Sequence, residues 1–465
     1  MSVASSLRRY AASRFLNVHA SPKSFRNRSA VAIRLQHVAP PPLNSSNGKA
    51  ACTPALKPGI SDDTYFPPNE NILFWRHFVT PQRPTETAAR LRRHVDHVFY
   101  TSRKNPSSIL YWLHAFARLA FFNNVFSSLG HTFLAMRLYD APLSTRLLAF
   151  PINHADELLH VFKQDYDNIR TGTYNMPWDV SLTHRQSSPF FILRQILALA
   201  AEAPRVLSKT VEKESSNSNW LHSKLFPHYY SQTFHHQTDG WLSSSSADVY
   251  EVSTESLFRG TQDAMQRTVL KAISLFVQSY HRNQSKLTML DLGAGTGRFS
   301  TFVRDNWPHA HYILADLSPF YLQKARENMS YWQRKRASSH LGPGSVRFMQ
   351  ANAEDLPLEK GSVDILYAVY LFHELPPHAR QKVVLEAARI LRPGGLFIIA
   401  DSVQFGDRLH RDSALGNFER LNEPWFSSFI ELDLGKLVCK DGMFTPYVKE
   451  VASMTKMLSF RRLGV

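Results

Sequence analysis

Short apolar runs alternate with longer amphipathic stretches in the second half of the chain. Five such runs read as buried strands, because each is rich in aliphatic residues and ends at polar or turn residues. Strands that alternate with helices at this spacing predict an α/β fold with a doubly wound, mostly parallel sheet. The runs lie within 287–299, 311–315, 346–358, 363–375 and 388–402.

The helix signals fall between these runs. A helix is expected to begin at about Arg298, directly after a glycine-rich turn. Ser318 and Pro319 are typical of an N-cap and of the first helical position, and they predict a long helix to about Lys335.

The first run ends in the most informative motif of the chain, LTMLDLGAGTGRF at 287–299. Asp291 is followed by Gly293, Gly295 and Gly297. Glycines at this spacing allow positive φ and a close approach of a ligand to the backbone, and the following helix offers unpaired N–H groups. The dinucleotide fingerprint G-x-G-x-x-G would need glycine at position 298, which is arginine, so a nicotinamide-dependent enzyme is not favoured.

The pattern D-x-G-x-G-x-G resembles the first motif of class I S-adenosylmethionine (SAM) methyltransferases. Asp316 stands nineteen residues after Gly297, at the end of the second predicted strand, where a carboxylate can accept both hydroxyls of a ribose. The resemblance implies SAM as cofactor and a cofactor site made of Asp291, Gly293, Gly295, Gly297, Asp316, Leu317, Asn352, Ala353, Tyr370 and Tyr250.

A narrower resemblance covers more than half of the chain. Residues from about 165 onward resemble a methyltransferase-11-type, quinone-methyltransferase-like family of cyanobacteria and of eukaryotic organelles. The resemblance implies a seven-stranded, Rossmann-like methyltransferase sheet, and it names no substrate. The phrases that carry it lie at 165–179, 234–258, 260–267, 317–332, 370–376, 401–408, 416–435 and 453–460.

Two positions depart from the family pattern. Asn352 stands where these enzymes commonly have an aspartate that accepts the adenine amino group, and its amide oxygen can still accept that hydrogen bond. Ala294 replaces a common cysteine, which is harmless because the backbone makes the contact.

Catalytic candidates follow the fourth and fifth predicted strands. His373 and Glu374 come just past the fourth, and Asp401 comes past the fifth, at the edge where open α/β sheets bind ligands. Three roles stay open for His373: a general base, a wall of the acceptor site, or packing without a role in the reaction. Asp401 is either catalytic or holds a loop.

Two further segments are candidates for the walls of the site. His235, His236, Asp239, Trp241 and Tyr250 form a polar-aromatic cluster, and the histidines lack a third ligand at metal spacing, so no metal site is predicted. A segment that closes over cofactor and substrate is expected there. The stretch 405–434, with Trp425, Phe426 and Phe429, would form the other wall and suits a flat or lipophilic acceptor, although core packing explains such aromatics equally well.

Charge is unevenly placed along the chain. The net charge is +16, and residues 1–61 contain nine Lys or Arg and no Asp or Glu, which leaves +7 for the remainder. This surplus is too small to indicate nucleic-acid binding. The acid-free start is typical of an organelle transit peptide and linker; its basic helix at 6–16 favours a mitochondrion slightly over a plastid, with a basic tail as the alternative.

Three regions are therefore expected: a transit peptide and linker at 1–61, a mostly helical N-terminal region at 62–222, and a methyltransferase domain at 223–465. The most apolar stretch, 109–126, is interrupted by His114, Arg118 and two asparagines. It is not a transmembrane span, and a buried helix is favoured over peripheral contact with a membrane. The chain has only two cysteines, Cys52 and Cys439, so a fold held together by disulfides is not expected.

The function that follows is methyl transfer from SAM, in an organelle, to an unidentified small aromatic or lipophilic acceptor. The alternative is a protein of the same fold that modifies a respiratory or photosynthetic complex or assists its assembly, with the helical region binding a protein partner.

Overall fold

The computed structural model describes residues 62–464, except for 82, 123–153, 189, 196, 199–200, 202–224, 232–233, 235–238, 281–283, 337–341 and 418–422. The expected transit peptide and linker at 1–61 lie outside the described residues, as do His235 and His236. Residues 56–465 form one compact unit.

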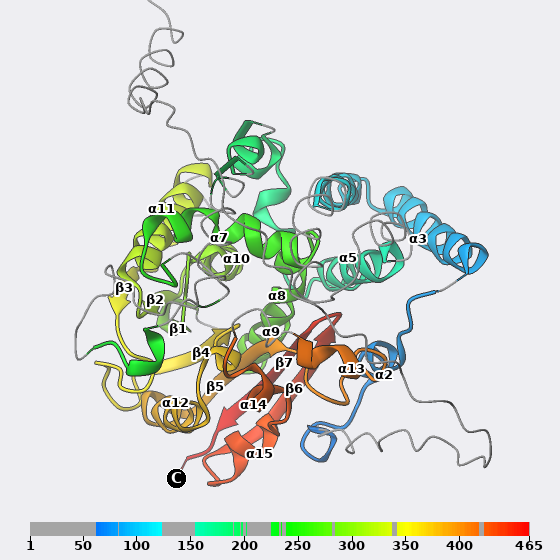
Figure 1. Cartoon of the computed structure of the whole chain (residues 1–465). Coiled ribbons are helices and arrows are strands. Elements are labelled where there is room, and N and C mark those ends of the chain that lie inside the picture. The colour runs from blue at the N-terminus through cyan, green and yellow to red at the C-terminus, as the bar shows by residue number, and fades with distance from the viewer. Residues whose placement is uncertain are drawn as a thin grey trace, which may run out of the picture. The chain divides into compact units, whose positions relative to one another are not determined.

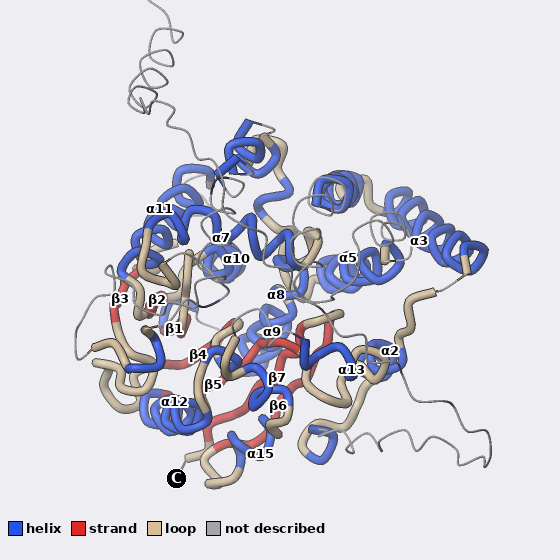
Figure 2. Tube along the Cα trace, viewed as in Figure 1, coloured by secondary structure: helices blue, strands red, loops and turns tan. Residues whose placement is uncertain are grey.

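The centre of this unit is one seven-stranded sheet with the order β3-β2-β1-β4-β5-β7-β6. The five strands from β3 to β5 pair in parallel, whereas β7 is antiparallel to both β5 and β6. The predicted doubly wound, mostly parallel sheet is confirmed (Figure 2). The strands are β1 (Thr288–Leu292), β2 (His311–Asp316), β3 (Val346–Gln350), β4 (Val363–Val369), β5 (Leu391–Ser402), β6 (Phe444–Ala452) and β7 (Thr455–Arg462).

Helices lie on both faces of the sheet (Figure 1). The expected helix starts at Arg298 and Pro319 are confirmed, with Ser318 as the N-cap of the second helix. The helices are α2 (Glu70–His77), α3 (Pro84–Lys104), α5 (Ala155–Arg170), α7 (Ser244–Leu257), α8 (Gln262–Gln266), α9 (Thr268–Tyr280), α10 (Arg298–Asn306), α11 (Pro319–Lys335), α12 (Pro377–Ile390), α13 (Asp412–Leu415), α14 (Phe426–Ile430) and α15 (Leu434–Cys439).

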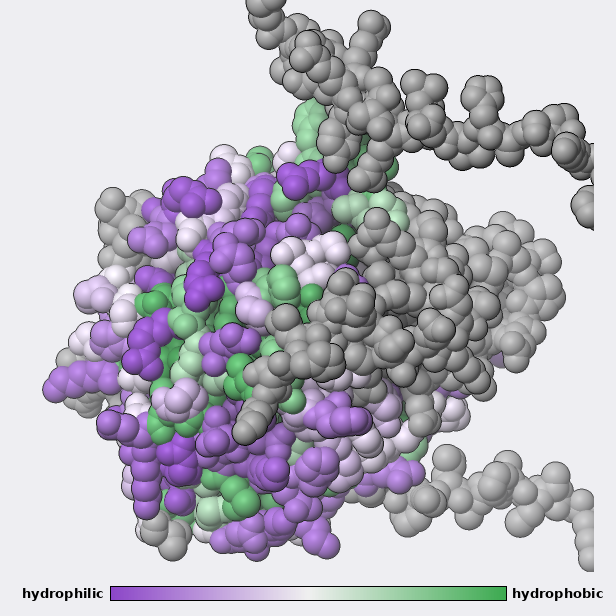
Figure 3. Space-filling model, turned by 60° about the vertical axis from the view of Figure 1, so that its left-hand side comes forward, coloured by the Kyte–Doolittle hydropathy of each residue, from purple (hydrophilic) through white to green (hydrophobic). Residues whose placement is uncertain are grey.

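Alternate residues of each strand enter different cores, as the period of two requires. On β1, Met289 joins the core under α9, α10 and α11, whereas Leu290 joins the core that contains α12, α14 and α15. Both faces of the parallel strands are therefore covered, which explains why their sequences are almost continuously apolar. On the side of the molecule that Figure 3 brings forward, hydrophilic residues predominate and hydrophobic ones form smaller areas between them.

The N-terminal region packs against the same cores as the sheet. Trp75 of α2 and Phe162 of α5 belong to the core that holds Leu290. Asp165 of α5 accepts two hydrogen bonds from the Arg267 guanidinium, at 2.9 and 2.6 Å. The expected boundary at 222/223 stays a prediction, and residues on its two sides share one hydrophobic core.

A buried charge cluster joins the first described residues to the last two strands. Asp62, in the 3-10 helix η1 (Asp62–Thr64), lies 2.6 Å from Nζ of Lys456 and 3.6 Å from Nζ of Lys449. Asp407 contacts the same two ammonium groups, at 2.9 and 3.1 Å. Two carboxylates thus balance two buried ammonium groups.

The apolar stretch at 109–126 is only partly buried. A helix covers residues 108–122, in which Tyr111 and Trp112 are buried and Leu113 is exposed. No helix within the described residues has both the length and the apolar character that crossing a membrane requires.

Candidate functional site

The glycine motif forms a tight loop between β1 and α10. Gly293, Gly295 and Gly297 all have positive φ, at 73°, 54° and 66°. A Cβ at Gly297 would lie 2.8 Å from Cβ of Ala325, so glycine here lets α11 approach the loop. At Gly295 the nearest atom to an added Cβ is 4.0 Å away, on Tyr321. The backbone of Gly295 is thus open to a ligand.

Asp316 ends β2 and faces the glycine loop. Its carboxylate accepts hydrogen bonds from the backbone N–H groups of Gly295 and Ser318, each at 2.8 Å. Burial raises the pKa of Asp316 to about 6, although these backbone hydrogen bonds favour the charged form. The residue following it, Leu317, accepts a hydrogen bond from the Gln350 amide through its carbonyl.

Asp291 lies beneath the loop rather than on its ligand side. It is 3% exposed, and its carboxylate accepts a hydrogen bond from the Ser300 hydroxyl at 2.6 Å. Ser300 also contacts the Tyr367 hydroxyl at 2.9 Å. Burial raises the pKa of Asp291 to about 7, and the negative charge of Asp316 adds to this increase.

Asn352 and Ala353 follow β3, next to the end of β2. The side-chain oxygen of Asn352 accepts a hydrogen bond from the N–H of Glu354 at 3.0 Å, which makes a local turn. A carbonyl oxygen has two lone pairs, so one acceptor position of Asn352 is still available for a ligand donor. Ala353 is half-buried against the core.

A pocket opens between the glycine loop and α7 and α8. Its walls include four carboxylates, of Glu251, Glu255, Asp263 and Asp291, and one guanidinium, of Arg298. Its remaining lining residues are Gln186, Tyr250, Thr254, Gln262, Gln266, Gly293, Ala294, Gly295, Thr296, Phe299 and Val369. Carboxyl groups thus outnumber basic groups in the lining, although Asp263 is paired with Arg298 and burial raises the pKa of Glu255 and of Asp291 to about 7.

Tyr250 lines this pocket, and its assignment to the cofactor stays a prediction. Its ring makes edge-to-face contacts with Trp241 and Tyr321, with ring centroids 5.9 and 5.5 Å apart. Burial raises the pKa of Tyr250, as do the nearby carboxylates of Glu374 and Asp316. Tyr250 thus lies between the end of β2 and the loop after β4.

Tyr370 points away from the glycine loop. It has a φ of 54°, and its hydroxyl forms a hydrogen bond with the hydroxyl of Thr455 on β7. Its ring stacks on Phe258, the C-cap of α7, with centroids 5.7 Å apart. Because β7 and β1 lie on opposite sides of β4, the Tyr370 hydroxyl lies on the β5–β7 side of the sheet edge.

His373, in the 3-10 helix η9 (Phe372–Glu374), is held by two carboxylates. Its Nδ1 lies 2.7 Å from Oδ1 of Asp401, and its Nε2 lies 3.3 Å from Oε1 of Glu374. Burial alone would lower the pKa of His373, but the two carboxylates outweigh it and raise the pKa well above its ordinary value. An imidazolium has no free lone pair, so the raised pKa disfavours His373 as a general base.

Asp401 also holds the loop after β4. Its Oδ2 accepts the backbone N–H groups of Phe372 and His373, at 2.8 and 3.3 Å, and its Oδ1 accepts the N–H of Ser402 at 2.7 Å. Of the two roles that the sequence leaves open for Asp401, this geometry favours the loop.

The stretch 405–434, which the sequence predicts as the second wall of the site, can line the site only in part. Phe426 and Phe429 are buried, and their rings pack against His373, with centroids 6.1 and 6.2 Å from the imidazole. They belong to the core, because α14 turns them inward, and do not present a face to an acceptor. Of the three, Trp425 is the half-buried one.

The comparisons identify the domain that contains this site. Residues 289–395 match the family model described as methyltransferase domain. The chain carries a class I SAM-dependent methyltransferase domain. The glycine loop and Asp316 lie within the matched residues, whereas Gln186 and the pocket residues of α7 and α8 precede them. SAM is the cofactor of this domain.

Curated relatives of the methyltransferase domain match over part of their length. An uncharacterized methyltransferase of Synechocystis sp. is 27% identical over 164 residues, which are 33% of this chain and 65% of that protein. A ubiquinone/menaquinone biosynthesis C-methyltransferase of Vibrio campbellii is 30% identical over 117 residues, 24% of this chain and 40% of that protein. The chain thus spans less than two thirds of each.

A solved structure, magnesium protoporphyrin IX methyltransferase of Synechocystis with bound SAH, superposes with a TM-score of 0.32. It is 14% identical, and the superposition covers 42% of this chain and 82% of that one.

The residues of the methyltransferase domain fit SAM by their chemistry. SAM is a cation with a ribose diol, and the chain offers a carboxylate at the end of β2 and an acidic pocket beside the open backbone of Gly295. A side chain at Gly293 would meet Leu371 at 3.1 Å, so this part of the loop also needs glycine.

Sequence reasoning missed the ion pairs that tie the N-terminal region to this site. Arg298 lies 2.5 Å from Asp179, 2.8 Å from Asp263 and 3.0 Å from the side-chain oxygen of Gln186. One signal was present in the sequence, because arginine stands at position 298, where the dinucleotide-binding fingerprint has glycine. Its partners are more than 30 residues away in sequence, and no local pattern identifies them.

Proposed function

We propose that this chain is a SAM-dependent methyltransferase. The observation that carries the proposal is the contact between the two ligand-binding segments: the N–H of Gly295 donates to Asp316, beside an acidic pocket. In this proposal the loop 293–297 and Asp316 bind the nucleoside, and the carboxylate of Glu251 at the pocket wall favours the positively charged methionine end.

The chain accelerates methyl transfer mainly by positioning. Bound SAM supplies a methyl group that is already activated on a sulfonium, so displacement needs an aligned nucleophile rather than a strong acid. Holding two reactants in line contributes roughly 7–11 kcal/mol in well-oriented systems. We assign His373 and Asp401 a positioning role, because their ion pair and the hydrogen bonds from Phe372 and Ser402 fix the loops after β4 and β5.

The proposed acceptor is a small aromatic or lipophilic molecule. Aromatic rings support this class. Tyr370, stacked on Phe258, lies on the β5–β7 side of the sheet edge, where we place the acceptor, and Tyr250 lies between that side and Asp316. A flat acceptor gains from ring contacts of this kind, at about 0.5–1.5 kcal/mol each.

The proposed location is an organelle, with a mitochondrion slightly favoured over a plastid. The support is the composition of residues 1–61, which are basic, free of acidic residues and rich in serine. A fluorescent protein fused after residue 61 tests this address: an organelle pattern is expected, and a cytosolic pattern would contradict it.

Incubation with methyl-labelled SAM and an organelle extract tests the enzymatic proposal. Label is expected in a small extractable molecule, and the Gly295→Ala variant is expected to transfer much less of it when SAM is limiting. Label in a protein of the extract would support the methyltransferase activity but would show that the acceptor is a protein and not a small molecule. A wild-type protein that fails to bind SAM would refute the activity itself.

A further inference from the structure

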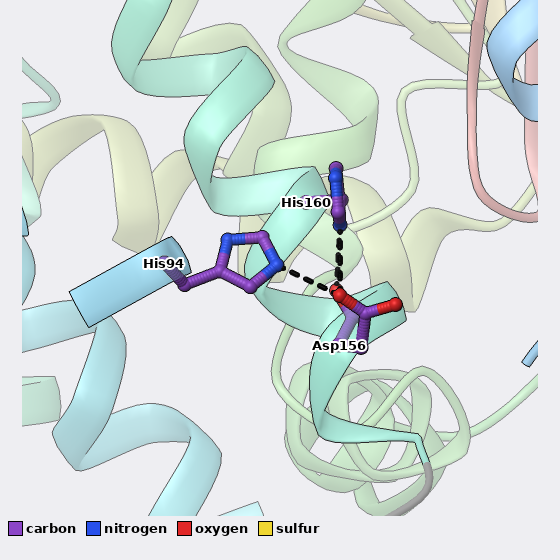
Figure 4. Close-up of side chains that lie close together, drawn as sticks. All are labelled: His94, Asp156 and His160. Carbon is purple, nitrogen blue, oxygen red and sulfur yellow. Dashed lines mark hydrogen bonds and ion pairs between the residues drawn. The ribbon is translucent and has the colours of Figure 1, made fainter. Parts of the chain in front are cut away.

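Three side chains of metal-ligand type meet away from the methyltransferase pocket. His94 of α3 and Asp156 and His160 of α5 point toward one another (Figure 4). Nε2 of His94 lies 2.9 Å from Oδ1 of Asp156, and Nδ1 of His160 lies 3.4 Å from the same oxygen. One ligand atom from each residue lies within 4.8 Å of the other two.

These separations fit the edges of a tetrahedral site. Zinc binds histidine nitrogen and carboxylate oxygen at about 2.0–2.2 Å, so two ligands at a tetrahedral angle are about 3.3 Å apart. The distances of 2.9 and 3.4 Å from Asp156 lie on either side of that value. Small side-chain shifts are therefore enough to place an ion between the three atoms.

Each ligand nitrogen already lies at hydrogen-bond distance from Asp156. Nε2 of His94 lies 2.9 Å from its carboxylate, and Nδ1 of His160 lies 3.0 Å from its backbone carbonyl oxygen. Histidine binds a metal through a deprotonated nitrogen, so a bound ion would take the place of the proton in these contacts.

The surroundings support the ligands. Arg90 donates to Oδ2 of Asp156 at 3.2 Å, and hydrogen-bonded carboxylates of this kind are common around bound metals. The guanidinium charge lowers the affinity of the site for any cation. The two imidazoles favour a transition metal over hard ions such as Mg²⁺ and Ca²⁺. The side chain of His160 is 26% exposed, which gives an ion a route from solvent.

α3 has a structural need for such a link. Its fully buried residues are Thr87, His94 and Thr101, all polar, although the helix is 21 residues long. Its apolar contacts with the core come from Leu91 and Val98, which are only half-buried.

We propose that His94, Asp156 and His160 form a structural site for a transition metal of the Zn²⁺ class, which joins α3 to α5. None of the three residues lines the methyltransferase pocket. The site is accordingly independent of SAM binding, and its metal stabilises the fold rather than taking part in methyl transfer.

Titration of the metal-stripped full chain with Zn²⁺ and Co²⁺ tests this site. Wild type is expected to bind one equivalent, to show the visible bands of tetrahedral Co²⁺ and to unfold at a higher temperature with metal. His94→Ala and His160→Ala are expected to bind at least about 100-fold more weakly, because each loses a direct ligand. His160 is part-exposed, so its variant keeps the test valid if His94→Ala does not fold.

His97→Ala is the matched control. His97 lies one turn further along α3, and its ring contacts Trp112 at a centroid distance of 5.9 Å. This variant should bind metal like wild type, and SAM affinity should be the same with and without metal. The proposal is overturned if wild type gains no thermal stability in excess Zn²⁺, which would make the cluster a hydrogen-bonded triad, or if His160→Ala binds metal as wild type does.

Discussion

Replacing Asp291 with asparagine should stabilise the protein at alkaline pH and lose this advantage in acid. Asp291 is 3% exposed on β1, between Leu314 of β2 and Tyr367 of β4. Its carboxylate has one hydrogen-bond donor in Ser300, at 2.6 Å. Asparagine has nearly the same shape and carries no charge, so Asp291→Asn removes the buried charge and little else.

The size of the effect follows from the pKa of this carboxyl group. Burial raises the pKa of Asp291 from 3.8 to about 7. Because the folded pKa is the higher one, the stability that the protonated form contributes is fully present below about pH 4 and is lost as the pH rises through about 7. A difference of about three pKa units corresponds to about 4 kcal/mol, which is the upper limit for the gain of the variant in alkaline solution.

Urea unfolding of wild type and Asp291→Asn from about pH 5 to about pH 8.5 measures this difference. Any effect of the amide on packing is the same at every pH, so only the change of the difference with pH reports on the charge. Ser300→Ala removes the hydrogen bond that favours the charged form, and should make the pH dependence of the wild-type carboxylate steeper. Parallel stability curves for wild type and Asp291→Asn would refute the reasoning.

Three further predictions concern ligand binding and the acceptor side. Gly295→Ala and its control Gly442→Ala place a side chain at similar positive φ, 54° and 66°, so both should lose similar stability. Only Gly295→Ala should weaken SAM binding, by about tenfold or more in calorimetry. Equal SAM affinities of the two variants would contradict the site. SAM affinity of the wild type should fall as the pH drops below about 6, where Asp316 becomes protonated, and the Asp316→Asn variant should bind SAM weakly at every pH. A wild-type SAM affinity that does not change with pH would argue against ribose binding by this carboxylate. His373→Gln should lower stability below pH 6.5 by about 3–5 kcal/mol, since it leaves the Asp401 carboxylate without its cation, and this loss should shrink as the pH rises through the raised pKa of His373. A wild-type methyl-transfer rate that rises through pH 6.5 and does so only with His373 present would instead make this residue a general base.

The parallel part of the fold could be predicted because its signals are local. Apolar runs that end at Asp291 and Asp316, and the Ser318-Pro319 helix start, mark β1, β2 and α11 within a residue or so. The strands β6 and β7 carry weaker signals, because charged residues interrupt them: Lys449 and Lys456 are buried in the cluster with Asp62 and Asp407. Such pairs are stable only in the folded chain, and no sequence window contains both partners.

The functional residues divide in the same way. The glycines share one turn after β1, and Asp316 ends the next strand, so local signals identify both. The contact of the Tyr370 hydroxyl with Thr455 could not be predicted, because a position after β4 does not determine the rotamer. The charge state of His373 depends on Asp401, which is 28 residues away and reaches it only through the pairing of β4 with β5.

The buried cluster around Asp62 sets a limit on maturation. If a leader is removed on import, the protease must cut before this residue, because Asp62 contacts both buried ammonium groups, of Lys449 and Lys456. A cut a few residues later would leave an uncompensated buried charge, at a cost of about 3–5 kcal/mol. A leader peptidase that trimmed too far would therefore produce a less stable enzyme, and the new N-terminus becomes a check on correct processing.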